Sequence, residues 1–178
     1  MAEHIYTISR KKFYPLSPSL SDIDIVDIAH ALSMLARANG HFPTFHSVAQ
    51  HSIECANEAV KRGMSARVCL ACLLHDGAEA YMSDVTTPVK DKMDVYRKCE
   101  ENLINMIYKK YIGELTDEEK EVVYTIDKDL LYHEFYHFMQ IELTPQTKLL
   151  SSPSFEFKEF SAVKDEFLKL FEHLSSLL

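Results

Sequence analysis

Residues 65–81 of this chain read SARVCLACLLHDGAEAY, and this stretch decides the fold class. From Val68 to Leu74 almost every residue is apolar, which is typical of a helix that other elements cover on all sides. Ser65 suits the N-cap of that helix, because its hydroxyl can accept a hydrogen bond from an amide of the first turn. We therefore predict a central, buried helix over residues 66–81.

Helical patterns with recognisable start and stop signals flank the central helix on both sides. The expected helices lie between Ser21 and Asn39, from Ser47 to about Lys61, from about Lys92 to Tyr111, from Thr116 to about Gln140 and from Ala162 to Leu177. Loops are expected at Phe13–Pro18, Met82–Pro88 and Thr144–Pro153. About six helices with short connections predict one all-α bundle that occupies residues 1–178 as a single domain.

The composition favours helices and excludes several classes of function. Four glycines and six prolines in 178 residues are few for a turn-rich β fold, and a hydrophobic content of 47% suffices for a substantial core. Acidic residues outnumber basic ones by 27 to 19, a net charge of −8, which argues against a nucleic-acid polymer as partner. Nine histidines direct attention to metal or proton chemistry.

The sequence shows no signal for export or membrane insertion. Its first 14 residues contain no apolar segment of signal-peptide length, and no apolar run approaches the ~18 residues of a membrane span. Four cysteines do not make a disulfide framework in a chain of this size. We expect a cytoplasmic protein with reduced thiols and no membrane partner.

An adjacent histidine and aspartate, His75 and Asp76, occur where the buried segment turns polar. Buried charge is costly unless it is paired or bound to a metal, and this pair can supply two ligands to one ion. His51, on the preceding expected helix, is a candidate third ligand, and Asp127 is a candidate fourth. Two imidazoles and two carboxylates suit Mn, Fe, Co, Ni or Zn better than Mg or Ca, which prefer oxygen ligands.

The pattern around these residues is recognisable. The segments LLHDGAEAY at 73–81 and DVTTPVK at 84–90 follow RANGH at 37–41 and SVAQHS at 47–52, and Asp127 with Glu134 closes the series. Together they resemble the HD-superfamily phosphohydrolases, and among these the HD-domain 5′-deoxynucleotidases and the phage-type deoxynucleotide hydrolases. The resemblance covers about residues 13–140.

The resemblance implies a fold, a reaction and roles for individual residues. It implies a helical HD domain that hydrolyses a phosphate ester of a small deoxynucleotide with one divalent metal ion, and relatives commonly form dimers or larger homo-oligomers. Glu79 would position or deprotonate the attacking water, and on a continuous helix it would share a face with His75 and Asp76. The implied metal ligands are His51, His75, Asp76 and Asp127, with Arg37 and Lys90 on the phosphate and Asp84 on the sugar.

Two positions depart from the family pattern. Ala38 stands where relatives often carry an aromatic residue, and Tyr124 stands where they carry a lysine. These positions bear on base stacking and on polyphosphate binding, so a monophosphate and a triphosphate substrate both stay open.

Two rival functions come from other classes. His133, Glu134 and His137 form an H-E-x-x-H pattern, the helix motif of zinc proteases, but no third ligand with the matching spacing follows. A non-catalytic HD module that senses a nucleotide or a metal would need the ligands without a water-activating acid, whereas Glu79 is present. Cys69 and Cys72 form a C-x-x-C pair inside the apolar helix and are expected to be core residues.

Overall fold

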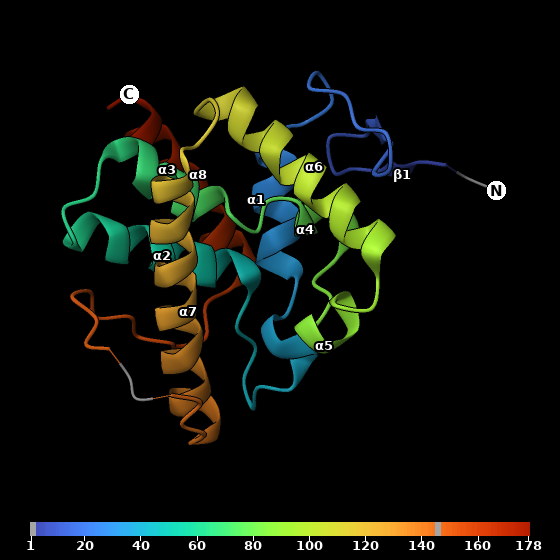
Figure 1. Ribbon diagram of the computed structural model, residues 1–178. Helices are drawn as coiled ribbons and strands as arrows, with labels where there is room; N and C mark the ends of the chain where they lie inside the picture. The colour runs from blue at the N-terminus through green and yellow to red at the C-terminus, as the bar shows by residue number, and fades with distance from the viewer. Residues whose placement is uncertain (1–2, 145–146) are drawn as a thin grey trace.

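A computed structural model describes residues 3–144 and 147–178 of the protein (Figure 1). Most of the described chain is helical, which confirms the all-α class predicted from the sequence. One small exception is an antiparallel pair near the N-terminus, β1 (Ile5–Tyr6) with β2 (Lys12–Phe13). This pair starts before the expected loop and includes Phe13, whose ring is fully buried and stacks on Tyr81 at 3.8 Å between centroids.

The core forms around α3 (Ala66–Leu74), which packs against α2 (Val48–Lys61) and α8 (Phe160–Ser175). Every α3 residue from Val68 to Leu74 is buried, as the apolar run predicts. Ser65 caps α3, and the predicted capping box of α2 forms between Ser47 and Gln50. Capping and core packing therefore place the N-terminal turns of both helices as expected.

The first long helix is shorter than predicted. α1 (Ile25–Met34) starts at Asp24, which accepts a hydrogen bond from the Val26 amide, so the expected cap at Ser21 is wrong. Its end lies well before Asn39, because the chain after Met34 turns away and pairs with the residues before α2. The Val48 amide donates to Leu35 O at 3.0 Å, and the Arg37 amide donates to His46 O at 2.8 Å.

The predicted helix over residues 66–81 is interrupted. α3 ends at Leu74, a turn follows, and a separate short helix, α4 (Glu79–Met82), begins. Gly77 occupies the turn, where a Cβ atom would lie 2.9 Å from Leu74 O. The turn carries His75 and Asp76, so these residues and Glu79 do not share one continuous helix face as the sequence suggested.

Two further long helices, α6 and α7, flank the core. α6 (Asp94–Tyr111) begins two residues later than expected, and α7 (Asp117–Met139) has the predicted capping box between Thr116 and Glu119. Before α6, the short helix α5 (Thr87–Lys90) begins inside the expected loop. Figure 1 shows α7 crossing in front of α2 and α3, with α5 and α6 on the opposite side of the molecule.

The segment between α7 and α8 contains no helix or strand over residues 147–159, in agreement with the predicted loop. Pro145 and Gln146 of that loop lie outside the described residues. α8 starts two residues before the predicted Ala162 and closes the bundle against α1, α2 and α3. Among the helices of the described residues, none combines the length and apolarity that crossing a bilayer requires.

Candidate metal centre and adjoining cleft

Three elements bring the four predicted ligands together. α2 supplies His51, the turn after α3 supplies His75 and Asp76, and α7 supplies Asp127. His51 Nε2 lies 3.0 Å from Asp127 Oδ1, and His75 Nε2 lies 3.7 Å from the same oxygen and 3.3 Å from Asp76 Oδ2. Ligands bound at about 2.0–2.2 Å from one ion have separations of this order.

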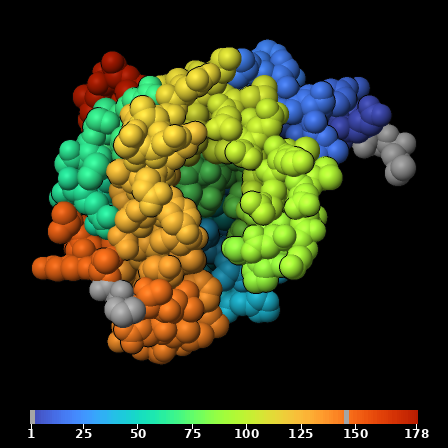
Figure 2. All heavy atoms as spheres, in the orientation of Figure 1, coloured from blue at the N-terminus to red at the C-terminus, as the bar shows by residue number. Residues whose placement is uncertain are grey.

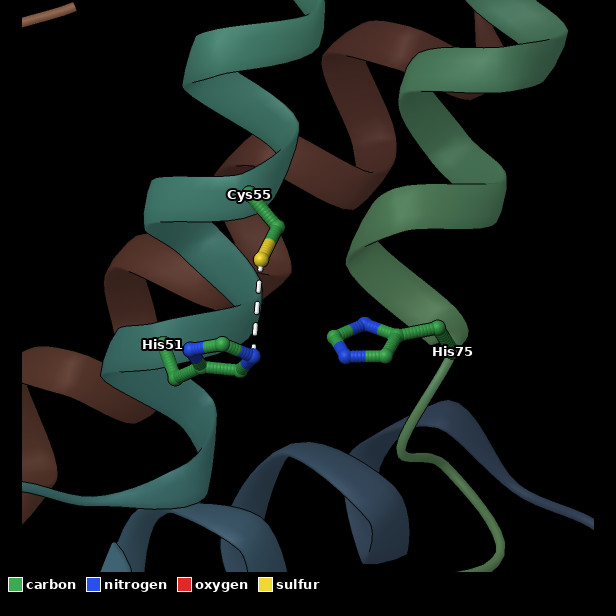
Figure 3. Close-up of side chains that lie close together, drawn as sticks. All are labelled: His51, Cys55 and His75. Atoms are coloured by element: carbon green, nitrogen blue, oxygen red, sulfur yellow. Dashed lines mark hydrogen bonds between the residues drawn. The ribbon is translucent and has the colours of Figure 1, made fainter. Parts of the chain in front are cut away.

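Both imidazoles present Nε2 to the space between them (Figure 3). His51 Nδ1 lies 2.6 Å from Glu134 Oε1, and His75 Nδ1 lies 2.7 Å from the carbonyl oxygen of Cys72. Each Nδ1 can therefore donate its hydrogen to a fixed acceptor, which leaves the Nε2 lone pair for a ligand. This arrangement is the usual one for metal-binding histidines.

Several buried polar atoms here have no hydrogen-bond partner. They include His75 Nε2, Asp76 Oδ2 and Glu79 Oε2. Because an unsatisfied buried acceptor is costly, three of them in one place indicate a bound species that satisfies them. Carboxylates also outnumber the cations, so a positively charged ligand fits the donor set. The residues present thus fit a divalent metal ion.

Cys55 is a further donor near the two imidazoles, beyond the four predicted ligands. The ligand atoms of His51, Cys55 and His75 all lie within 4.8 Å of one another, so this buried group could hold a metal ion. Cys55 Sγ is 3.5 Å from His51 Nε2, as the dashed line in Figure 3 marks. Burial raises the pKa of the Cys55 thiol to about 11, which disfavours the thiolate that a metal needs.

The protonation of His51 depends on opposing contacts. Burial and the positive charge of Arg37 lower its pKa, but the acidic groups around it, Glu134 and Asp127 among them, outweigh both and raise it well above 6.5. A proton and a metal ion therefore compete for Nε2. Hydrogen bonds from His51 and His75 hold the pKa of Asp127 well below its usual range despite its burial.

A cleft of about 360 Å³ adjoins these ligands. Figure 2 shows it as a hollow between α7 on one side and α5 and α6 on the other, with the green α3–α4 region at its floor. Asp76 and Asp127 lie in its wall, so the cleft opens onto the ligand cluster. Its other lining residues include Arg37, Phe42, Asp84, Lys90, Lys128 and Phe135.

Glu79 and Lys90 face each other at the edge of the cleft. Lys90 Nζ lies 3.8 Å from Glu79 Oε1 and 2.7 Å from Glu100 Oε1. Burial and the negative charges of Asp76 and Asp84 raise the pKa of Glu79 well above 4.5, although Lys90 opposes them. A buried carboxyl group with a shifted pKa, placed beside candidate metal ligands, is a candidate for an acid–base role.

Arg37 and Asp84 complete the predicted set. The Arg37 NH1 group lies 3.6 Å from Asp76 Oδ2, and its NH2 group lies 3.2 Å from Glu134 Oε2. Arg37 Nε is buried and has no hydrogen-bond partner. Burial raises the pKa of Asp84, which lines the cleft. All eight predicted site residues thus surround the ligand cluster or the cleft.

Glu134 contacts a candidate metal ligand, but the sequence predicted no role for it at this site. It is fully buried and lies against His51, His46 and Arg37. A signal was present, because Glu134 follows Asp127 by seven residues, or about two helical turns, and therefore shares its face of α7. The motif series that resembles the HD family includes Glu134 after Asp127, but the resemblance gives it no role.

The two histidines of the H-E-x-x-H pattern have other partners. His133 Nε2 donates to Thr147 O at 2.7 Å, and the His137 ring packs against Phe138 and Phe155 with centroids 4.9 Å apart in each pair. These contacts lie outside the cluster around Asp127, from which His133 and His137 are about 120° and 80° away around the helix at 100° per residue. A zinc-protease site is therefore not assembled from these residues.

No protein-family model matches this chain. The chain is 36% identical over 107 residues to the uncharacterized protein YfdR of Escherichia coli K12, a match that covers 60% of this chain and 57% of that protein. It is 40% identical over 87 residues to an uncharacterized protein of Rhodobacter capsulatus, covering 47% and 44%. The chain thus spans about half the length of the curated relatives it matches, and neither name states an activity.

Proposed function

We propose that this protein is a divalent-metal-dependent phosphohydrolase of the HD type that acts on a small deoxynucleotide. The observation that carries the proposal is a cluster of four ligand residues with unpartnered acceptor atoms, two of which, Asp76 and Asp127, line a cleft that also holds cations. The motif resemblance supports the same reaction class. We place the protein in the reducing cytoplasm, which agrees with its four free thiols.

The metal ion would be held by His51, His75, Asp76 and Asp127. When bound, it would supply Lewis-acid activation of water and neutralise phosphate charge. Two imidazoles among the donors favour Mn, Fe, Co, Ni or Zn over Mg.

Residues of the chain itself would carry out the proton transfer and bind the substrate. Glu79 accepts a proton from the attacking water, since its Oε2 is buried and unpartnered at the edge of the cleft. Arg37 and Lys90 bind the phosphate oxygens, the first as a bidentate fork and the second as a point charge. Asp84 accepts a hydrogen bond from a sugar hydroxyl in the same cleft.

The cleft favours a nucleotide over an inorganic phosphate. Phe42 and Phe135 pack edge to face at 5.3 Å and line one part of the cleft, which offers an apolar surface to a base. Lys128 adds a third cation, with its Nζ 5.2 Å from the centroid of the Tyr124 ring. This lysine stands one residue after Asp127 and compensates for the cation that Tyr124 replaces.

A hydrolysis panel tests the proposal by measuring phosphate, pyrophosphate, triphosphate and the nucleoside or nucleotide product. A monophosphate substrate releases phosphate, whereas a triphosphate substrate releases triphosphate or pyrophosphate. Purified protein is incubated with deoxynucleoside mono- and triphosphates and with ribonucleotides, each with Mn²⁺, Co²⁺ or Mg²⁺. We expect turnover of a deoxynucleotide with Mn²⁺ or Co²⁺, and its loss in His75→Ala. The matched control is His133→Ala, which removes an imidazole outside the cluster and should keep the activity. Metal binding without turnover on any nucleotide would instead support a sensing module.

A further inference from the structure

Glu134 is a buried carboxylate at the back of the ligand cluster, on α7, with no exposed surface. Three groups surround it: His51 Nδ1 at 2.6 Å, Arg37 NH2 at 3.2 Å and His46 Nε2 at 3.3 Å. A fully buried carboxyl group is costly unless partners satisfy its oxygens, and these three contacts satisfy both of them.

The contact with His51 controls a metal ligand. The imidazole can present Nε2 to an ion only if Nδ1 carries the hydrogen and the ring holds its rotation. Glu134 Oε1 accepts from Nδ1 at 2.6 Å, a short charge-assisted bond that fixes both properties. His75 has its own acceptor, the Cys72 carbonyl, so Glu134 acts on only one of the two histidines.

The contact with Arg37 controls the anion-binding side. Arg37 reaches the site from a short 3₁₀ turn, Arg37–Gly40, in which Ala38 and Asn39 adopt φ of 50° and 52°. A side chain on such a turn needs an anchor to hold its guanidinium in one place. Glu134 Oε2 supplies that anchor to Arg37 Nη2 at 3.2 Å, while Arg37 Nη1 lies 3.6 Å from Asp76 Oδ2.

We propose that Glu134 is a positioning residue whose two oxygens fix the His51 ring for metal binding and the Arg37 guanidinium for phosphate binding. The inference rests on the proposed function, because it assumes that His51 binds a metal ion. It assigns to a single side chain the coupling between the metal half and the phosphate half of the site.

A competing role for Glu134 is that of a ligand. His46, Glu54 and Glu134 place three donor atoms within 4.8 Å of one another, which is compatible with a second ion. However, Glu134 Oε1 already accepts from His51 and Oε2 faces Arg37, whose positive charge would repel a second cation. The contacts therefore favour positioning, and the stoichiometry of metal binding separates the two roles.

The test measures Co²⁺ affinity and the visible absorption of bound Co²⁺ in the whole protein, with no nucleotide present. Glu134→Gln keeps an acceptor oxygen for His51, whereas Glu134→Met removes it at similar volume. We expect affinity to fall about 10-fold in the first and about 100-fold in the second, within the range for outer-shell partners of metal ligands. We also expect a changed Co²⁺ spectrum, which reports the ligand geometry.

The control is Glu58→Gln, which alters another fully buried carboxylate two turns from His51 along α2. It should lower thermal stability and leave Co²⁺ affinity and spectrum unchanged. If Glu134→Met does not fold, the Co²⁺ affinities and spectra of Glu134→Gln and Glu58→Gln are compared, and a change in Glu134→Gln alone supports the positioning role.

Three outcomes oppose different parts of the argument. Folded Glu134 variants with wild-type Co²⁺ affinity and spectrum would overturn the positioning role. Two Co²⁺ ions per wild-type chain, with one lost in the Glu134 variants, would replace it by the ligand role. No Co²⁺ binding in the wild type, or unchanged binding in His51→Ala, would instead overturn the proposed metal site.

Discussion

At the scale of single residues, the proposed role of Glu79 as proton acceptor can be distinguished from the role of the metal ligands by measuring hydrolysis and Co²⁺ affinity separately. Glu79→Gln removes the proton acceptor but keeps the size of the side chain. We expect hydrolysis to fall by about 100- to 10,000-fold, the usual contribution of general acid–base catalysis, while Co²⁺ affinity stays within a few-fold of the wild type. The hydrolysis panel and a Co²⁺ titration on the same samples measure both quantities.

A comparison with Asp76→Asn shows whether the assay distinguishes the two roles. That variant should lose metal affinity together with activity, because Asp76 is a proposed ligand with an unpartnered oxygen. Full activity in Glu79→Gln would show that the attacking water loses its proton elsewhere.

Burial also sets the reactivity of the four thiols. Cys55, Cys69 and Cys72 are buried, and burial raises the pKa of each, to about 11 in Cys55. Cys99 is partly exposed. Because the thiolate is the reactive form, a thiol-specific chromogenic reagent should label one cysteine rapidly in the folded protein and four after denaturation. Rapid labelling that persists in Cys99→Ser would contradict this assignment.

At the scale of elements, the break between α3 and α4 positions the His75–Asp76 pair. A Cβ on Gly77 would lie 2.9 Å from Leu74 O and 3.2 Å from Ile107 Cδ1, so the turn tolerates no side chain. We expect Gly77→Ala to cost about 1–3 kcal/mol of stability and to weaken Co²⁺ binding by displacing the turn. Chemical denaturation and Co²⁺ titration measure the two effects.

Gly63→Ala is the matched control for this substitution. Gly63 has φ +72° but open space around its missing Cβ, so an alanine there meets backbone strain and no contact. It should lower stability while leaving Co²⁺ affinity unchanged. An equal loss of Co²⁺ affinity in both variants would mean that general destabilisation, and not the turn, explains the effect.

Glu58 ties the segment before α8 to α2. Its carboxylate accepts from the amides of Leu150 and Ser151 and pairs with Arg62 at 2.8 Å. Burial opposes ionisation, but hydrogen bonds from Ser151 and Leu150 and the Arg62 charge lower the pKa of Glu58 to about 2. Because the folded pKa lies below the unfolded value of 4.5, this stabilisation is complete above pH ~4.5 and declines towards pH 2.

Urea denaturation of the wild type and Glu58→Gln at several pH values tests that window. We expect the variant to be less stable by about 1–3 kcal/mol at pH 7, and the difference to shrink between pH ~4.5 and 2. Glu121→Gln, at an exposed position of α7, should show little difference at any pH. A difference in the free energy of unfolding that stays constant down to pH 2 would show that the shape of the Glu58 side chain, and not its charge, stabilises the fold.

The elements that the sequence predicted are those specified by local chemistry. The capping boxes at Ser47 and Thr116 and the apolar run of α3 each depend on neighbouring residues, and all three are present. The break after Leu74 was missed because a helix pattern continues through it. In the turn, the Gly77 amide donates to Leu74 O at 2.8 Å, and Ile107, about 30 residues away in the sequence, leaves no room for a Cβ at Gly77. Similarly, α1 ends early because its following residues pair with the chain before α2.

At the scale of the whole molecule, the site exists because the bundle brings α2, α3 and α7 together at one cleft. The ligand types were visible in the sequence, since His51, His75, Asp76 and Asp127 carry metal-binding groups. Which nitrogen of the His51 ring faces the other ligands was not visible, because the Glu134 carboxylate, 83 residues away, occupies Nδ1. Long-range acceptors of this kind leave little trace in one sequence.

If the proposed metal ion binds at this cleft, its effect on stability is the prediction that belongs to the whole fold. Asp76, Glu79, Asp84 and Asp127 line the cleft against three cations, Arg37, Lys90 and Lys128, and one oxygen each of Asp76 and Glu79 lacks a hydrogen-bond partner. A divalent ion that binds only the folded chain should therefore stabilise it, by about 2.7 kcal/mol at a free concentration of 100 times Kd. In a chain of this size that corresponds to a Tm rise of roughly 5–10 °C.

Thermal unfolding with Mn²⁺, Co²⁺ or Mg²⁺, and after addition of a chelator, measures this shift. Mn²⁺ and Co²⁺ should raise Tm more than Mg²⁺, because imidazole nitrogen is a poor ligand for Mg²⁺. The increase should disappear in His75→Ala but persist in His133→Ala, whose ring donates to Thr147 O outside the cluster. An equal increase in all three proteins would locate the ions on the acidic surface of this chain, whose net charge is −8, and not at the cleft.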